Sequence, residues 1–249
     1  MLSYPFLQRA LIVGILVSLC SALLGTSLVL KRYSMIGDGL SHVGFSALAI
    51  AYAVGAAPIT VSIPVYIIAA FLLLRMNENS RIKGDAATAL MCSGALAVGV
   101  MTISLTTGMN TDVCNYMFGS ILAMSESDVV ISVVLSIVVV ILFVAFYPRI
   151  FAVTFDENFS KATGVNSALY NMIIAMLTAV TVVLGMRMMG TLLISSLIVF
   201  PSLSAMRIFR KFLEVVIASV VIAIVCFCAG IYVSYAYSTP TGASIVIIN

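Results

Sequence analysis

The sequence predicts an all-α integral membrane protein that crosses the bilayer about eight times. Of its 249 residues, 63% are hydrophobic and 8% are charged, whereas about a quarter of the residues of a soluble domain carry a charge. The mean hydropathy is +1.23. Long uncharged runs follow one another along the chain, and most Lys and Arg residues fall in alternate loops between them. We therefore expect a single transmembrane domain, residues 1–249, in the plasma membrane.

The uncharged runs give the expected positions of the helices. A helix needs about twenty apolar residues to cross the hydrocarbon core. The runs are residues 10–30, 39–74, 86–111, 129–148, 162–186, 188–206 and 215–249. The second run is long enough for two crossings, and Gly55 and Pro58 interrupt it, so it predicts two helices joined by a tight turn.

The distribution of Lys and Arg predicts the orientation, because cytoplasmic loops retain positive charge. One set of alternate loops holds ten of these residues: Lys31, Arg32, Arg75, Arg81, Lys83, Arg149, Lys161, Arg207, Arg210 and Lys211. The other set holds only Arg9 and Arg187. This bias predicts that both termini and the loop over residues 112–128 lie outside the cell.

That outer loop carries three acidic residues and no basic one: Asp112, Glu126 and Asp128. Acidic groups could dock an external binding protein or concentrate cations near the membrane. A solvated loop without either role is the alternative.

Two classes of function are excluded. The net charge of +3 is small and its positive residues are scattered, which argues against nucleic-acid binding. The chain has no Gly-x-x-x-x-Gly-Lys-Ser/Thr phosphate loop, so we expect no enzyme activity of its own and an ATPase partner for any ATP-driven process.

The five cysteines lie mostly in apolar runs without Cys-x-x-Cys spacing and are interpreted as small core residues. They are Cys20, Cys92, Cys114, Cys226 and Cys228.

Ionisable groups enter an apolar run at one place, the segment Gly-Asp-Gly-Leu-Ser-His over residues 37–42. Charged groups at membrane depth are costly and tend to have a partner or a function. Asp38 and His42 are four residues apart, which places them one turn apart on one face of a helix. A carboxylate and an imidazole suit Zn²⁺, Mn²⁺ or Fe²⁺. The alternative is that Asp38 caps the helix and that His42 is an interior histidine with a hydrogen-bond partner.

Two further observations favour a metal site. His42 is the only histidine of the chain, and Asp38 is the only acid between Arg9 and Arg75. One helix supplies only two ligands, whereas a symmetric homodimer with this helix on its axis would supply four. The small residues of the segment would permit the close approach of two such helices. They are Gly37, Gly39, Ser41, Gly44 and Ser46.

Several motifs together resemble a known family. They are Tyr-Pro-Phe-Leu-Gln-Arg-Ala at 4–10, Leu-Lys-Arg at 30–32 leading into 37–42, Met-Gly-Thr-Leu-Leu-Ile at 189–194 through Phe200-Pro201, and Ser-Thr-Pro-Thr-Gly-Ala-Ser at 238–244. The chain resembles the permease family of ABC importers for zinc, manganese and iron. The resemblance implies a polytopic ABC-importer permease fold, a homodimeric or paired permease, cytoplasmic ABC ATPases and an extracytoplasmic solute-binding protein. It implies that Asp38 and His42 line the path of a transported ion, zinc or manganese ahead of iron, with no cofactor bound permanently.

The cytoplasmic loop at about residues 149–166 holds the longest polar stretch on its side of the membrane, residues 155–166. Phe155 and Phe159 are spaced one helical turn apart, and Gly164 is suited to end a short helix. The stretch resembles the family's coupling helix, which implies ATPase contacts by Phe155, Asp156, Glu157, Phe159, Lys161 and Gly164. An interfacial helix that packs on the membrane is the alternative.

Two other functions compete with an ATP-driven permease. A self-sufficient carrier could exchange protons for metal at Asp38 and His42, because histidine titrates near neutral pH. An intramembrane metalloenzyme would use similar ligands to activate water, but the sequence shows no third ligand and no general base beside them.

Overall fold

The computed structural model describes residues 5–55, 64–66, 68–69, 71–72, 85–106 and 126–249. Within these residues every regular element is a helix. The helices are α1 (Pro5–Leu30), α2 (Ile36–Val54), α4 (Asp85–Leu105), α6 (Glu126–Phe155), α7 (Glu157–Ala162), α8 (Ser167–Met189), α9 (Thr191–Ile208), α10 (Phe212–Tyr237) and α11 (Thr241–Ile248). Six of them are long and apolar enough to cross a membrane. The prediction of an all-helical, multi-pass membrane protein is confirmed.

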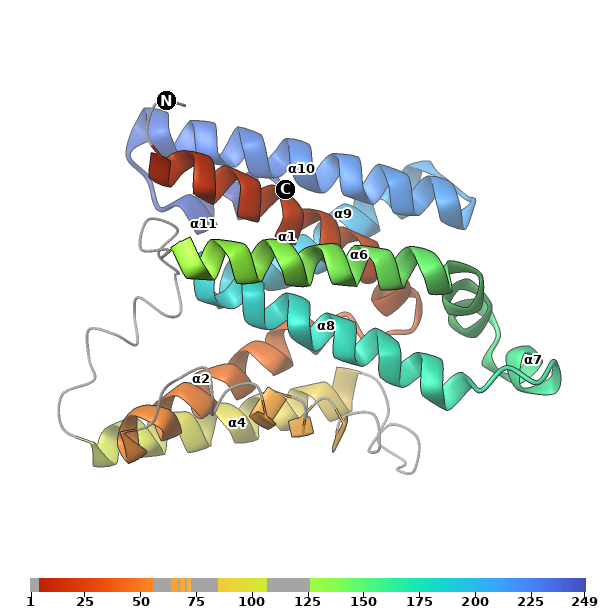
Figure 1. The fold of residues 1–249 in the computed structure, drawn as a ribbon, viewed down its shortest axis with the longest axis horizontal. Coiled ribbons are helices and arrows are strands. Elements are labelled where there is room, and N and C mark those ends of the chain that lie inside the picture. Colours follow the sequence, from red (N-terminus) through yellow and green to blue (C-terminus); the bar gives the residue numbers. More distant parts are fainter. Residues whose placement is uncertain (1–4, 56–63, 67, 70, 73–84, 107–125) are drawn as a thin grey trace.

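The long helices run side by side along the longest axis of the molecule, with α1 near the centre (Figure 1). α1 packs against α6, α8, α9 and α10. Its buried face includes Val13, Val17, Leu24 and Leu28, each at most 2% exposed. α2 packs on α4 and also contacts α8 and α9. α2 and α4 thus form a pair on one side of the bundle (Figure 1).

Glycines end two of the helices, because they adopt the positive φ that other residues avoid. α2 ends before Gly55, whose φ is 71°. α2 therefore ends where the sequence predicts a turn, whereas Pro58 and the rest of that turn lie outside the described residues. α8 ends before Gly190, whose φ is 85°, and α9 begins at the next residue. By contrast, α6 continues through Pro148 and α9 through Pro201.

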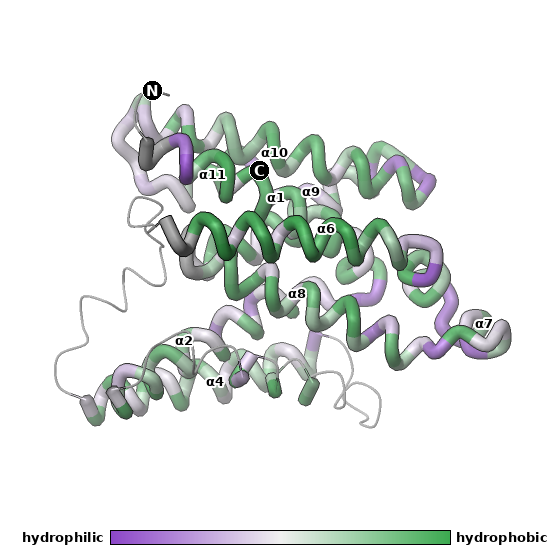
Figure 2. The backbone as a smooth tube through the Cα atoms, in the orientation of Figure 1, coloured by the Kyte–Doolittle hydropathy of each residue, from purple (hydrophilic) through white to green (hydrophobic). Residues whose placement is uncertain are grey.

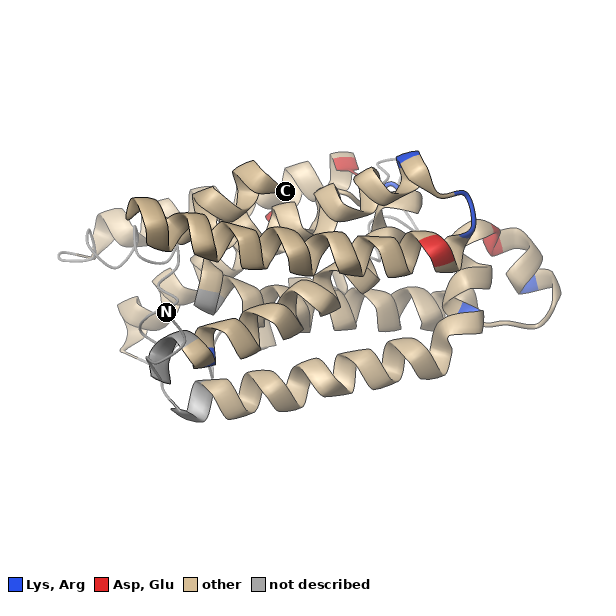
Figure 3. Ribbon diagram, turned by 90° about the horizontal axis from the view of Figure 1, so that it is seen from above, with Lys and Arg blue, Asp and Glu red and all other residues tan. Residues whose placement is uncertain are grey.

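Most of the Lys and Arg residues that the structure describes gather at one end of the bundle (Figure 3). Aromatic contacts join this end: the ring of Phe151 near the end of α6 lies 5.2 Å from that of Phe212 at the start of α10. Arg149 of α6 donates a hydrogen bond of 2.5 Å to the Tyr170 hydroxyl of α8. Apolar residues cover the lengths of the helices between the two ends (Figure 2). Three basic residues of the same predicted side, Arg75, Arg81 and Lys83, lie outside the described residues.

Candidate metal-ion site

Asp38 lies in the first turn of α2, where the positive end of the helix dipole favours a carboxylate. The N-cap of this helix is Met35, and its side chain makes no capping hydrogen bond. The N-cap residue of α2 is thus Met35 and not Asp38. The carboxylate instead lies beside the histidine one turn along the helix.

The distance from His42 Nε2 to Asp38 Oδ1 is 3.7 Å. The two side chains share one face of α2, as their spacing predicts. Their exposed fractions are 18% for His42 and 35% for Asp38. Both groups are therefore reachable from the surface of a single chain, although the helix that carries them is largely buried on its other faces.

A third donor comes from α4. Cys92 Sγ lies 3.8 Å from Asp38 Oδ2, and one donor atom from each of Asp38, His42 and Cys92 lies within 4.8 Å of the other two. The interpretation of Cys92 as a small core residue is incomplete, because its partly buried thiol faces a carboxylate. Sequence spacing could not reveal this contact, since it depends on how α2 packs against α4.

Small residues explain why these two helices pack so closely. A Cβ atom at Gly39 would lie 2.6 Å from Thr88 Cγ2, and one at Gly99 would lie 2.6 Å from Phe45 Cδ1. Ser46 Oγ also donates a hydrogen bond to the carbonyl oxygen of Ala95. Removing the Cβ atom therefore allows the α2 and α4 backbones to approach each other.

Other small residues of α2 face the rest of the chain. A Cβ atom at Gly37 would lie 3.0 Å from Ile198 Cδ1 of α9, and one at Gly44 would lie 1.6 Å from Tyr66 Oη. The sequence suggested these glycines for the approach of a second copy. The structure uses them for close packing within one chain.

The predicted coupling segment forms a short helix, but not over the predicted residues. Asp156 has extended backbone, with φ −144° and ψ 96°, and caps α7 by accepting a 2.9 Å hydrogen bond from the Phe159 amide. Phe155 therefore belongs to α6 and not to the same helix as Phe159, which corrects the prediction. Its ring lies 4.9 Å from that of Phe151 and 5.7 Å from that of Phe212.

The remaining coupling residues lie on or beside α7. Phe159 is 62% exposed. Lys161 Nζ lies 2.9 Å from Glu157 Oε1, and this contact lowers the pKa of Glu157. Gly164 has a φ of 82° and follows the end of the helix, as the sequence predicts.

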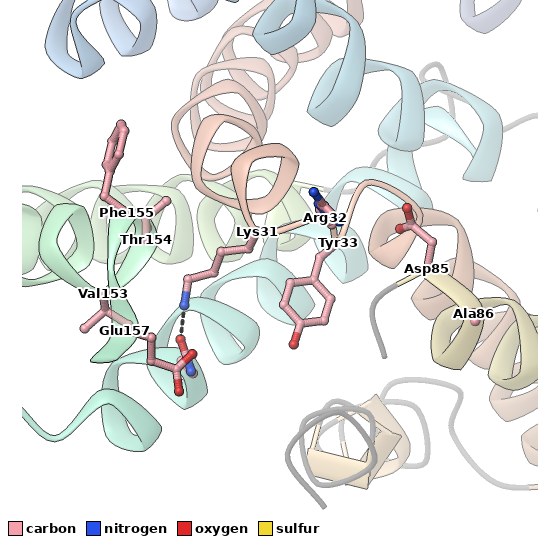
Figure 4. A pocket seen from close by; sticks show the side chains of 10 residues that line it. Lys31, Arg32, Tyr33, Asp85, Ala86, Val153, Thr154, Phe155 and Glu157 are labelled. Carbon is pink, nitrogen blue, oxygen red and sulfur yellow. Dashed lines mark hydrogen bonds between the residues drawn. The ribbon is translucent and has the colours of Figure 1, made fainter. Parts of the chain in front are cut away.

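A cavity of about 570 Å³ lies between α7 and the turn that joins α1 to α2 (Figure 4). Lys31, Tyr33, Asp85, Glu157 and Asn171 are among its lining residues. Lys31 Nζ donates a hydrogen bond to Asn171 Oδ1. Burial lowers the pKa of Lys31 from 10.5 to about 8, although the nearby Glu157 carboxylate acts in the opposite direction. The turn that leads into α2 thus lines the same cavity as Glu157 of the predicted coupling segment.

The acidic loop that the sequence predicts to lie outside is only partly described. Asp112 lies outside the described residues, and Glu126 and Asp128 are in the first turn of α6. Their role in docking a binding protein stays a prediction.

The family model for the ABC 3 transport family matches residues 3–249. The chain belongs to the ABC 3 transport family. Within this family it is 27% identical over 248 residues to the manganese transport system membrane protein MntC of Halalkalibacterium halodurans, covering 100% of this chain and 85% of that protein. It is 27% identical over 246 residues to the high-affinity zinc uptake system membrane protein ZnuB of Haemophilus influenzae. This match covers 99% of this chain and 94% of that protein.

Two solved structures share the fold of this chain. PsaBC from Streptococcus pneumoniae, in complex with Fab, matches with a TM-score of 0.85 and 26% identity over 99% of this chain and 88% of that one. An inward-facing structure of a putative metal-chelate type ABC transporter shares the fold, with a TM-score of 0.73 and 15% identity over 97% and 82% of the two chains. The resemblance to permeases of metal-ion ABC importers is confirmed. This ABC 3 permease is a membrane subunit whose ATPase is a separate chain.

Proposed function

We propose that this ABC 3 permease carries zinc or manganese, ahead of iron, across the plasma membrane by way of Asp38 and His42. The observation that supports this most directly is the pair itself: a carboxylate and the only imidazole of the chain, 3.7 Å apart within a bundle of apolar helices. Related proteins named for manganese and zinc transport are similar over at least 99% of this chain. The cargo is held briefly during passage and is not a resident cofactor.

The chemistry of the pair suits a transported dication. An ion that leaves water must exchange part of its hydration shell for protein ligands, and the charge of Asp38 offsets part of that cost. His42 adds a nitrogen ligand that zinc and manganese both accept. Two groups on one helix face hold the ion loosely enough for release when the surrounding helices move.

A second copy of the chain would complete the path. Asp38 remains 35% exposed on a single chain, and a charged group in a membrane bundle is expected to face a partner or a water-filled path and not lipid. A two-fold axis beside α2 would place two Asp38 and His42 pairs near one another. We therefore propose a homodimer with the ion path between its subunits.

The energy would come from ATPase subunits docked at α7. The exposed Phe159 ring and the Glu157 and Lys161 pair offer an apolar contact flanked by charges. The basic residues gather at this same end of the bundle (Figure 3), and positive loops are retained in the cytoplasm. We place the start of α1 and the end of α10 outside, and a solute-binding protein would deliver the ion at that opposite end. The last helix, α11, turns back along α10, so that Ile248 lies beside Cys226.

Uptake of radioactive zinc and manganese by cells that express the complete transporter tests the assignment. We expect Asp38→Asn and His42→Gln each to reduce uptake by at least about tenfold. Loss of a residue that only orients a metal ligand commonly lowers metal affinity or activity by that factor, and Asp38 and His42 are proposed to be ligands themselves. The amount of assembled complex in the membrane should not change. Glu214→Gln is the matched control, since this acid pairs with Lys211 at the end of α10.

Normal uptake by both site variants would refute the assignment. The purified chain alone, placed in vesicles with an imposed pH gradient, separates the proposal from a proton-coupled carrier. We expect no uptake in that experiment, and gradient-driven uptake would contradict the need for an ATPase.

A further inference from the structure

We infer that Cys92 of α4 is a third donor to the ion held by Asp38 and His42, and that its thiolate makes the site prefer zinc to manganese. This inference rests on the proposed function of the Asp38 and His42 pair. It adds a residue that lies on a different helix, α4, and that belongs to no sequence motif described above.

The geometry is close to that of a bound ion. With bonds of about 2.0–2.3 Å, the ligand atoms of a tetrahedral zinc site lie about 3.3–3.8 Å apart. The structure has 3.7 Å from Asp38 Oδ1 to His42 Nε2 and 3.8 Å from Asp38 Oδ2 to Cys92 Sγ. All three donors lie within 4.8 Å of one another. The central carboxylate presents one oxygen to each neighbour, and a small rotation of the side chains would bring the three groups around one ion.

Cys92 differs from other described cysteines in the partner of its thiol. Cys20 Sγ donates to the carbonyl oxygen of Ser136, and Cys226 Sγ donates to that of Ile248. In both cases the thiol contacts a backbone carbonyl group of another helix and no ionisable side chain. Cys92 Sγ points instead at the carboxylate of the metal-site pair, between helices held together by Gly39 and Gly99.

The donor set has a chemical preference. A thiolate is a soft ligand that suits zinc, whereas manganese is better matched by carboxylate and water oxygens. Zinc would bind Cys92, His42 and Asp38 together and displace the thiol proton to water. Manganese would be held chiefly by the carboxylate. Three ligands from one chain leave a fourth position for water or for a donor of the second copy.

The experiment measures metal binding to the purified transporter complex. Co²⁺ replaces zinc as a spectroscopic probe, because cobalt bound to a thiolate gives a sulfur-to-metal charge-transfer band. We expect this band in the wild type and in the control Cys228→Ser, and its loss in Cys92→Ser and in Cys92→Ala. Zinc affinity should fall by about tenfold in both Cys92 variants, while manganese affinity stays within about threefold of the wild-type value.

Retention of the cobalt band and of zinc affinity in the Cys92 variants would overturn the inference. An equal loss of zinc and manganese affinity would also overturn it, because the inference states that the Cys92 thiolate favours zinc over manganese. If Asp38→Asn and His42→Gln lose metal while the Cys92 variants do not, the proposed function stands without this inference. If Asp38→Asn and His42→Gln bind and transport metal normally, the proposed function itself fails.

Discussion

Cys92 Sγ lies 3.8 Å from Asp38 Oδ2, although 54 positions separate the two residues in the sequence. The contact depends on the close packing of α2 against α4, which in turn depends on glycines at the helix interface. The spacing between two helices therefore controls the shape of the candidate metal site. A substitution that alters this spacing and leaves every donor atom in place should therefore change metal binding.

Gly39→Ala should weaken metal binding without removing a ligand. The new Cβ atom would lie 2.6 Å from Thr88 Cγ2, so the Thr88 side chain or the α4 backbone next to Asp38 must shift. Overpacking of this kind costs about 1–3 kcal/mol. Zinc titration and thermal unfolding in detergent should both show a loss.

Gly94→Ala on α4 is the matched control for Gly39→Ala, because nothing lies within 4 Å of a Cβ atom there. We expect this control to leave zinc affinity unchanged and not to lower the unfolding temperature, because Ala is favoured over Gly inside a helix. Equal effects of the two substitutions would contradict the role of the α2–α4 spacing.

Lys31→Met should raise the unfolding temperature at pH 7. Lys31 is largely removed from water and its pKa falls to about 8, so below that pH the folded state bears the cost of a buried charge. As the pH rises from about 8 to 10.5, folded wild-type protein loses this proton before the unfolded chain does, and its stability increases. The difference between variant and wild type should therefore shrink across this range.

Thermal unfolding measured at a series of pH values checks the Lys31 prediction. Lys211→Met is the control, because Lys211 is 81% exposed and pairs with Glu214 at the surface. A constant difference between Lys31→Met and wild type at all pH values would show that burial of the charge is not the cause.

Asp156→Ala should uncouple transport from ATP hydrolysis by unwinding α7. The Asp156 carboxylate accepts a hydrogen bond from the Phe159 amide, and loss of such a cap costs about 0.5–2 kcal/mol. Asp156→Asn keeps the cap and should preserve coupling. The ratio of metal transported to ATP hydrolysed by the complete transporter measures the effect, and similar ratios for Ala and Asn would count against the role of the cap.

Phe159→Ala should weaken binding of the ATPase, whereas Phe155→Ala should mainly lower stability. Both rings are exposed, Phe159 at 62% and Phe155 at 58%. The Phe155 ring, however, lies 4.9 Å from that of Phe151 and 5.7 Å from that of Phe212, so its loss removes contacts between α6 and α10. Co-purification of the ATPase and thermal unfolding of the permease separate the two effects. Phe159→Leu keeps apolar bulk and should retain most of the binding, and unimpaired co-purification with Phe159→Ala would exclude this contact.

The sequence by itself determined the features that depend on local order along the chain. Composition and uncharged runs predicted the helices, Gly55 predicted the end of α2, and four-residue spacing placed Asp38 and His42 on one face. Only the tertiary structure decided which residues of other helices these features contact. Cys92 joins the pair through helix packing, Phe155 is separated from Phe159 by the extended backbone of Asp156, and the α2 glycines contact their own chain. Helical periodicity orders residues within one helix, but the contacts between helices depend on how side chains from distant segments fit together.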